Sequence, residues 1–103
     1  MRIKRNLGYM EITDSGASGA VNFVLGLSGK EVGVAYKERT DYGIYAVSVR
    51  GSKTCKVHLG KLVNRLSTEF GGSGGGHDKA CGASIPKSQI SKFINALNIE
   101  LGK

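Results

Sequence analysis

Residues 31–50 read Glu-Val-Gly-Val-Ala-Tyr-Lys-Glu-Arg-Thr-Asp-Tyr-Gly-Ile-Tyr-Ala-Val-Ser-Val-Arg. Apolar side chains alternate with polar or small ones over residues 31–39 and again over residues 42–50, which is the period of a β-strand. Thr40-Asp41 supplies a short turn between the two segments. We therefore predict that this stretch forms an antiparallel hairpin.

Three segments before and after the hairpin carry apolar side chains at helical spacing. They are Ala17, Ala20, Val21, Val24 and Leu25; then Leu59, Leu62, Val63 and Leu66, extended by Phe70; and finally Ile90, Phe93, Ile94, Leu97 and Leu101. Asp14 or Ser15 is the predicted cap of the first helix, and Gly29 is its predicted end. In the third helix, Pro86 lies near the start and Gly102 lies just past the end.

Residues 9–12 and 80–85 are short enough to be further strands. The resulting order of elements predicts an α/β fold, in which one two-layer domain holds a mixed sheet of about four to five strands covered by about three helices. We expect this domain to span residues 9–103. Residues 1–8 are expected to be the end of a linker or an N-terminal extension.

The composition favours a basic, globular protein with a polyanionic partner. In 103 residues, 15 basic side chains stand against 8 acidic ones, and the net charge of +7 favours binding to nucleic acid, with an inert basic surface as the competing interpretation. No apolar stretch is long enough to span a membrane, and no signal-peptide pattern is present. Cys55 and Cys81 are too few for a disulfide framework, so we expect free thiols and a cytoplasmic location.

Residues 70–84, Phe-Gly-Gly-Ser-Gly-Gly-Gly-His-Asp-Lys-Ala-Cys-Gly-Ala-Ser, are unusually rich in glycine. A loop without side chains can turn several backbone N–H groups toward one anion and let it approach closely. His77 and Lys79 follow the glycines and could bond or neutralise a phosphate. We predict a phosphate-binding loop, with a flexible surface linker as the competing interpretation.

Two cysteines and two histidines also have the spacing of a zinc site. Cys55 and His58 are three residues apart, and His77 and Cys81 are four apart, which gives four ligands of the right type. Against this, Cys81 lies in an apolar, small-residue stretch that is typical of a strand packed in a core. Zinc is therefore the minor alternative.

No catalytic constellation is visible in the chain. His77 stands where the lysine of a nucleotide P-loop would follow the glycines, which excludes that motif. The acidic residues are scattered, without the paired carboxylates that a two-metal phosphoesterase needs. The isolated chain is expected to bind a ligand without catalysing a reaction.

Ser48-Val49-Arg50 at a strand end, then a helix, then Gly-Gly-Gly-His-x-x-Ala-x-Gly at residues 74–82 resembles the C-terminal DHH-associated domain of DHH-type phosphoesterases. The resemblance covers roughly residues 9–101. It implies a separate N-terminal lobe whose Asp-His-His motifs hold divalent metals, usually manganese, and carry out the hydrolysis. This chain contains no Asp-His-His sequence. The catalytic lobe is thus expected to be absent from this chain or carried by another.

The resemblance implies that this domain grips the substrate of a metal-dependent exonuclease or oligonucleotide hydrolase. The expected substrate is single-stranded nucleic acid, a short oligonucleotide or a nucleotide phosphate. The candidate substrate-binding residues are Ser48, Arg50, Gly74, Gly75, Gly76, His77 and Lys79. No cofactor is expected in this chain, and the metal would belong to the DHH lobe. Gly71-Gly72-Ser73 lengthens the family's usual glycine run, and Cys81 stands where many members have alanine. The alternative function is an interaction module that forms a homodimer, with the glycines as a tight backbone crossing.

Overall fold

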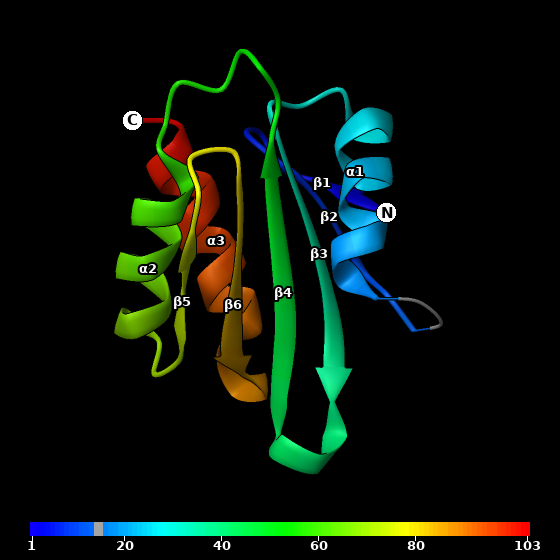
Figure 1. Ribbon diagram of the computed structural model, residues 1–103, viewed down its shortest axis with the longest axis vertical. Coiled ribbons are helices and arrows are strands. Elements are labelled where there is room, and N and C mark those ends of the chain that lie inside the picture. Colours follow the sequence, from blue (N-terminus) through cyan, green and yellow to red (C-terminus); the bar gives the residue numbers. More distant parts are fainter. Residues whose placement is uncertain (14–15) are drawn as a thin grey trace.

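The predicted hairpin is confirmed in the computed structural model, which describes residues 1–13 and 16–103. β3 (Val32–Arg39) and β4 (Ile44–Gly51) pair antiparallel along their whole length (Figure 1). Their connection is longer than the predicted Thr40-Asp41 turn, because a 3-10 turn (Thr40–Tyr42) is followed by Gly43. Gly43 has a φ of 63°, a left-handed conformation that glycine adopts at little cost.

Four more strands flank the hairpin in a mixed sheet. β2 (Gly8–Glu11) runs parallel to β3, and β6 (Ala80–Pro86) runs antiparallel to β4. β1 (Arg2–Ile3) pairs with β2, and β5 (Ser73–Gly76) pairs with β6, so the strand order is β1-β2-β3-β4-β6-β5. The α/β class is confirmed, and β1 and β5 raise the strand number to six, slightly above the prediction.

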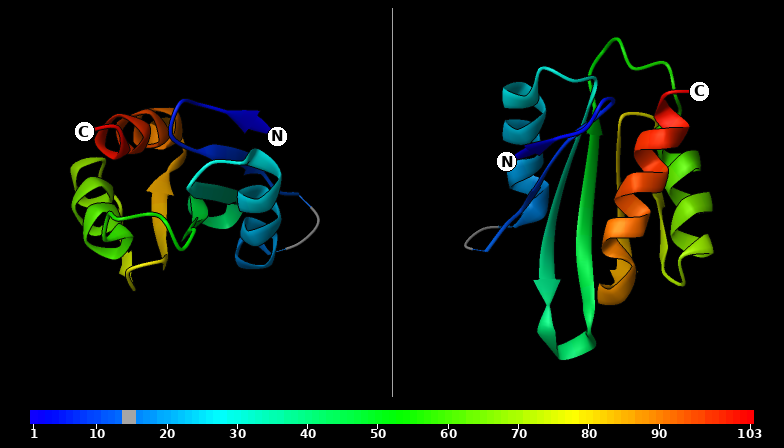
Figure 2. Two further views of the ribbon diagram at one scale, coloured as in Figure 1. Left: turned by 90° about the horizontal axis from the view of Figure 1, so that it is seen from above. Right: turned by 180° about the vertical axis from the view of Figure 1, so that it is seen from behind.

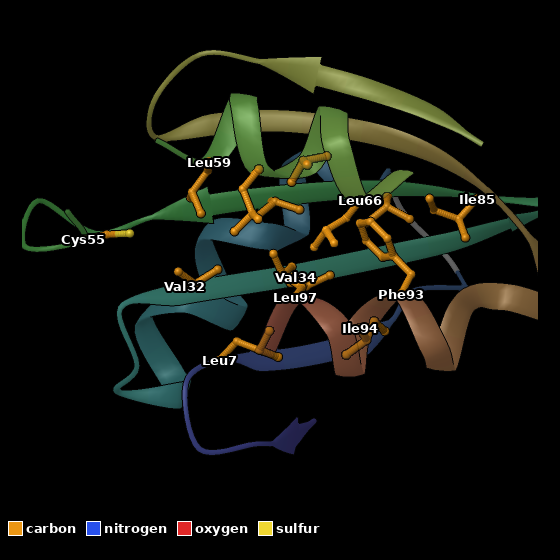
Figure 3. Packing of buried hydrophobic residues seen from close by; sticks show 14 residues of the cluster. Leu7, Val32, Val34, Cys55, Leu59, Leu66, Ile85, Phe93, Ile94 and Leu97 are labelled. Carbon is orange, nitrogen blue, oxygen red and sulfur yellow. The ribbon is translucent and has the colours of Figure 1, made fainter. Parts of the chain in front are cut away.

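The three predicted helices form and lie on both faces of the sheet. α1 (Ala17–Ser28) packs on β2, β3 and β4, whereas α2 (Leu59–Glu69) and α3 (Ile90–Leu101) pack on the other face (Figure 2). The larger core lies between the sheet and the α2–α3 pair (Figure 3). Its buried members are Leu7, Val32, Val34, Val47, Val49, Cys55, Leu59, Leu62, Val63, Leu66, Ile85, Phe93, Ile94 and Leu97.

The described helix ends follow the sequence signals only in part, since α1 begins after Gly16, which makes no side-chain capping bond. Gly29 ends α1 with a φ of 68°, as predicted. His58 caps α2, because its Nδ1 accepts a hydrogen bond of 3.2 Å from the backbone N–H of Lys61. The predicted caps of α1, Asp14 and Ser15, lie outside the described residues.

Several connections between elements lie together at one end of the molecule. The end of β4, the β5–β6 hairpin, the α1–β3 connection and the C-terminus all lie at the upper end in Figure 1. Residues 1–8 contribute β1 and the fully buried Leu7 to the domain. In the described part of the chain, no helix has the length and apolar character needed to cross a membrane.

Candidate phosphate-binding site

Arg50 lies near the end of β4, on the face of the sheet that α1 partly covers. Val49 points into the core beneath α2 and α3, so the alternating side chains of Ser48 and Arg50 point to the opposite face. The register pairs Arg50 with Gly33 of β3 and Ala80 of β6. On the Gly33 side the backbone of α1 packs closely at Leu25, whereas on the β6 side the small Ala80 is the neighbour of the arginine.

The guanidinium of Arg50 contains a buried donor, its Nε, which has no hydrogen bond within the described part of the chain. The ion pairs formed there do not include Arg50 either, so the salt bridge that a purely structural arginine would make is not seen. An unsatisfied buried donor costs about 1–3 kcal/mol, and more when the donor is charged. An oxyanion bound at this point would remove that cost through a charge-assisted hydrogen bond.

Beside Arg50 the sheet surface is open. α1 covers β2, β3 and β4, and no helix among the described elements packs on the same face of β6 and β5. A row of small, half-buried residues crosses these strands beside Arg50, because Ser48 pairs with Gly82 and Gly82 pairs with Gly75.

The glycine run is a strand, and the predicted free loop is therefore wrong for most of its length. Residues 73–76 form β5 and pair antiparallel with β6, from Ser73 opposite Ser84 to Gly76 opposite Cys81. Gly75 and Gly76 have φ values of 146° and 145°, which side chains of L-residues disfavour. A Cβ on Gly76 would lie 2.8 Å from the Cβ of Cys81. Glycine is thus required here by the packing of β5 against β6, whatever else it does.

Two residues of α2 that support β5 were missed by the sequence reasoning. A Cβ on Gly60 would lie 2.2 Å from the carbonyl oxygen of Gly76, so the helix and the strand touch through their backbones. The Asn64 side chain donates a hydrogen bond of 2.8 Å to the carbonyl oxygen of Gly74. The available signal was a glycine in the first turn of a predicted helix, opposite a glycine-rich segment.

His77 and Lys79 both lie in the β5–β6 hairpin, but only the side chain of Lys79 bonds to another segment of the described chain. The N–H of His77, just after β5, donates a 2.9 Å hydrogen bond to the carbonyl of Ala80, which itself pairs with Arg50, so the three residues lie in one row. His77 is exposed. The Lys79 ammonium bonds the carbonyl of Cys55 and lies 3.6 Å from the carboxylate of Asp78. Lys79 therefore anchors the hairpin to the β4–α2 connection.

The structure does not assemble the zinc alternative. Cys55 is buried in the core, and His58 is occupied as the cap of α2. Across residues 1–13 and 16–103, no three histidine, cysteine or acidic side chains come together in a way that would hold a metal ion. Cys81 packs against the core from β6, in agreement with the packing interpretation.

The Cys81 thiol makes the stability of the domain depend on pH. Burial raises the pKa of Cys81 from its ordinary value of 9.0 to about 11, and the Arg50 charge opposes this rise only in part. The thiol ionises sooner in the unfolded chain, so its stabilising contribution is complete below pH 9 and is lost as the pH rises toward 11. We expect the free energy of unfolding of the wild type to fall, relative to that of Cys81→Ala, across this interval. Urea denaturation at several pH values measures it, and parallel curves for the two proteins would refute the assignment.

Comparison with known proteins identifies the family. The family model described as the DHHA1 domain matches residues 7–103. An uncharacterised protein of Methanocaldococcus jannaschii is 43% identical over 61 residues, which cover 50% of this chain and 18% of that protein. The chain thus corresponds to less than a fifth of this curated relative.

Two solved structures share the fold. The C-Ala domain of alanyl-tRNA synthetase from Aquifex aeolicus superposes with a TM-score of 0.78 at 13% identity, covering 100% of this chain and 97% of that one. The pGpG-specific phosphodiesterase PggH from Vibrio cholerae gives a TM-score of 0.69 at 14% identity, covering 98% of this chain and 34% of that one. The β4 arginine, the glycine strand and the match over residues 7–103 agree with one another: this chain belongs to the DHHA1 domain family, which is associated with DHH phosphoesterases.

Proposed function

We propose that this domain binds the phosphate groups of a single-stranded nucleic acid, a short oligonucleotide or a nucleotide at the Arg50–His77 row. The observation that carries the proposal is the buried Nε of Arg50, which has no partner within the described residues. Arginine binds phosphate through a planar fork of donors, and this one borders an open sheet face. A bound phosphate would complete its hydrogen bonding.

The row has dimensions that suit a nucleotide unit. Neighbouring strands lie about 4.8 Å apart, so the backbones of Arg50 and His77, separated by Ala80, are about 10 Å apart. A phosphate on Arg50 therefore leaves room for His77 to bond a second polar group of the same ligand. The small residues of β6 offer a flat surface on which a base could lie.

The proposed partner is a DHH catalytic lobe. This chain covers 34% of the PggH chain, so that phosphodiesterase carries roughly two thirds of its length outside the shared fold. We infer that hydrolysis requires such a lobe, which would hold divalent metal, manganese in our proposal, while this domain fixes the substrate across the cleft. The isolated domain would be inactive, and the complete enzyme would work in the cytoplasm.

Binding to a fluorescently labelled single-stranded oligonucleotide tests the proposal. We expect weak binding that weakens further with salt, because about two phosphate contacts on a single strand predict a slope of log affinity against log salt of about −1.4. Fluorescence anisotropy at several salt concentrations measures the slope. Salt-independent affinity, or no binding at low salt, would contradict phosphate recognition.

An interaction module is the second candidate, favoured by the outer surface of α1. Phe23 and Leu27, one turn apart on this helix, are 61% and 58% exposed, and α1 carries no charged residue. This surface is suited to a protein partner or a second copy of the chain. Sedimentation over a range of protein concentrations distinguishes the candidates, since a dimerisation module would show concentration-dependent association without nucleic acid.

A further inference from the structure

A second cleft lies at the same end of the molecule and shares no residue with the Arg50–His77 row. It has a volume of about 600 Å³ and lies between the β1–β2 turn, the α1–β3 connection, the β4–α2 connection and the C-terminal end of α3. This volume is in the range of small-molecule sites, roughly 300–1,000 Å³. Three separate connections and one helix end thus build one concave surface.

Hydrogen bonds between these connections fix the walls of the cleft. The backbone N–H and the side-chain amide of Asn6 donate to Asn98 of α3, each at 2.8 Å. The N–H of Ser52 donates a 2.8 Å bond to the carbonyl of Glu31, which joins the α1–β3 and β4–α2 connections. These bonds hold the cleft in shape before any ligand arrives, which lowers the entropy cost of binding.

The rim of the cleft is strongly cationic. Arg5, Lys30, Lys56 and Lys103 line it, and Glu31 is the one acidic residue among its lining side chains. Lys103 is paired with Glu100 at 2.6 Å, whereas no ion pair of the other three basic residues is seen in the described structure.

The dipoles of α1 and α3 account for only two of the four basic residues at the rim. A cation near a helix C-terminus is stabilised by the partial negative charge of the last carbonyls. Lys30 and Lys103 follow the C-termini of α1 and α3 and fit that role. Arg5 and Lys56 come from connections that do not follow a helix C-terminus, so the dipoles do not account for them. Like charges brought to one concavity repel each other unless an anion joins them.

The floor of the cleft is apolar. Val32 and Cys55 lie at the end of the core that faces it (Figure 3), and Val57 and Leu101 are half-buried beside them. An apolar floor under a cationic rim suits a ligand that has both an anionic group and a flat, weakly polar part. From this combination we infer that the cleft is a second binding site, which takes a nucleoside monophosphate with its base on the floor and its phosphate at the rim.

Titration of the ¹⁵N-labelled protein with AMP tests this inference. We expect amide shifts at Val32 and Val57, together with binding at least tenfold tighter than that of adenosine or inorganic phosphate, because only AMP contacts both floor and rim. Lys30→Glu and Lys56→Glu should each weaken binding about tenfold or more, the usual effect of losing a charge-assisted bond. Lys92→Glu makes the same charge change on an exposed position of α3 outside the cleft and should leave the affinity nearly unchanged.

Several outcomes would overturn the inference. Equal affinity for phosphate and AMP would show that the cleft binds phosphate alone and does not bind the base. If Lys92→Glu weakened AMP binding as much as the cleft variants do, the effect would come from the net charge of the protein. Absence of shifts at Val32 and Val57 in a folded protein, judged by its remaining amide spectrum, would refute the site itself. Arg50→Ala leaves the cleft intact, so AMP shifts at Val32 and Val57 should persist in that variant. Failure of the Arg50–His77 proposal is thereby distinguishable from failure of this one.

Discussion

Arg50→Ala is expected to weaken oligonucleotide binding by roughly tenfold to a hundredfold, because losing a charge-assisted hydrogen bond costs about 1.5–3 kcal/mol. The fold should be nearly unaffected, since Arg50 lies outside the apolar core and its Nε has no hydrogen bond in the described structure to lose. Arg50→Lys keeps the charge but removes the planar fork, so its affinity should fall between those of the wild type and the alanine variant. Fluorescence anisotropy with thermal denaturation of the same samples measures both properties.

Arg39→Ala is the matched control for this experiment. Arg39 ends β3 at the opposite end of the hairpin, where its guanidinium lies over the ring of Tyr42. The substitution removes the same charge and should change the affinity little. If Arg39→Ala and Arg50→Ala weaken binding equally, the domain attracts nucleic acid by net charge alone. If Arg50→Ala instead unfolds the domain while the affinity per folded molecule is unchanged, the arginine is structural.

Gly60→Ala is expected to destabilise the domain by about 3 kcal/mol, the upper part of the usual range for overpacking. The added methyl group would lie 2.2 Å from the carbonyl oxygen of Gly76 and 2.8 Å from that of His77. Both neighbours are backbone, so α2 and β5 must separate for the side chain to fit. For a domain of this size, the melting temperature should fall by about 10–20 °C. Binding should weaken as well, because the displaced strand leads into His77.

Gly19→Ala provides the control on another helix. Gly19 lies in the first turn of α1, and apart from its own helix turn no described atom lies within 4 Å of the added Cβ. Alanine is favoured over glycine in a helix by about 1 kcal/mol, so this variant should be as stable as the wild type or more stable. A drop in melting temperature for Gly19→Ala, or none for Gly60→Ala, would contradict the packing described for these two positions.

The hairpin and the helices were predictable because their residues repeat with a clear period. Val32 and Val34 alternate along β3, and the apolar spacing of α2 and α3 gives one buried stripe on each helix. The family resemblance rests on similarly local signals, and the match over residues 7–103 confirms it. These features can be predicted from residues that are close together in the sequence.

β5 was not predictable in the same way. A strand of Ser-Gly-Gly-Gly has no alternating side chains, so its sequence suggests a loop, and only its pairing with β6 and the cover of α2 make it a strand. The anchoring of Lys79 on the Cys55 carbonyl was also hidden, because the two residues are 24 positions apart. The placement of Ser48, Arg50 and His77 around one open face depends on strand order, which local sequence does not encode.

The most direct test of the central claim is an NMR titration that follows the Nε–Hε signal of Arg50 and the amides of Gly74, Gly75, Gly76 and His77. The buried Nε has no hydrogen-bond partner in the described part of the protein, so a phosphate bound there should shift its resonance strongly. With a short single-stranded oligonucleotide at low salt, we predict that the Arg50 and His77 signals shift together along one saturating curve. An unchanged Arg50 signal at saturation, with shifts confined to other surfaces, would contradict the claim that this row binds phosphate.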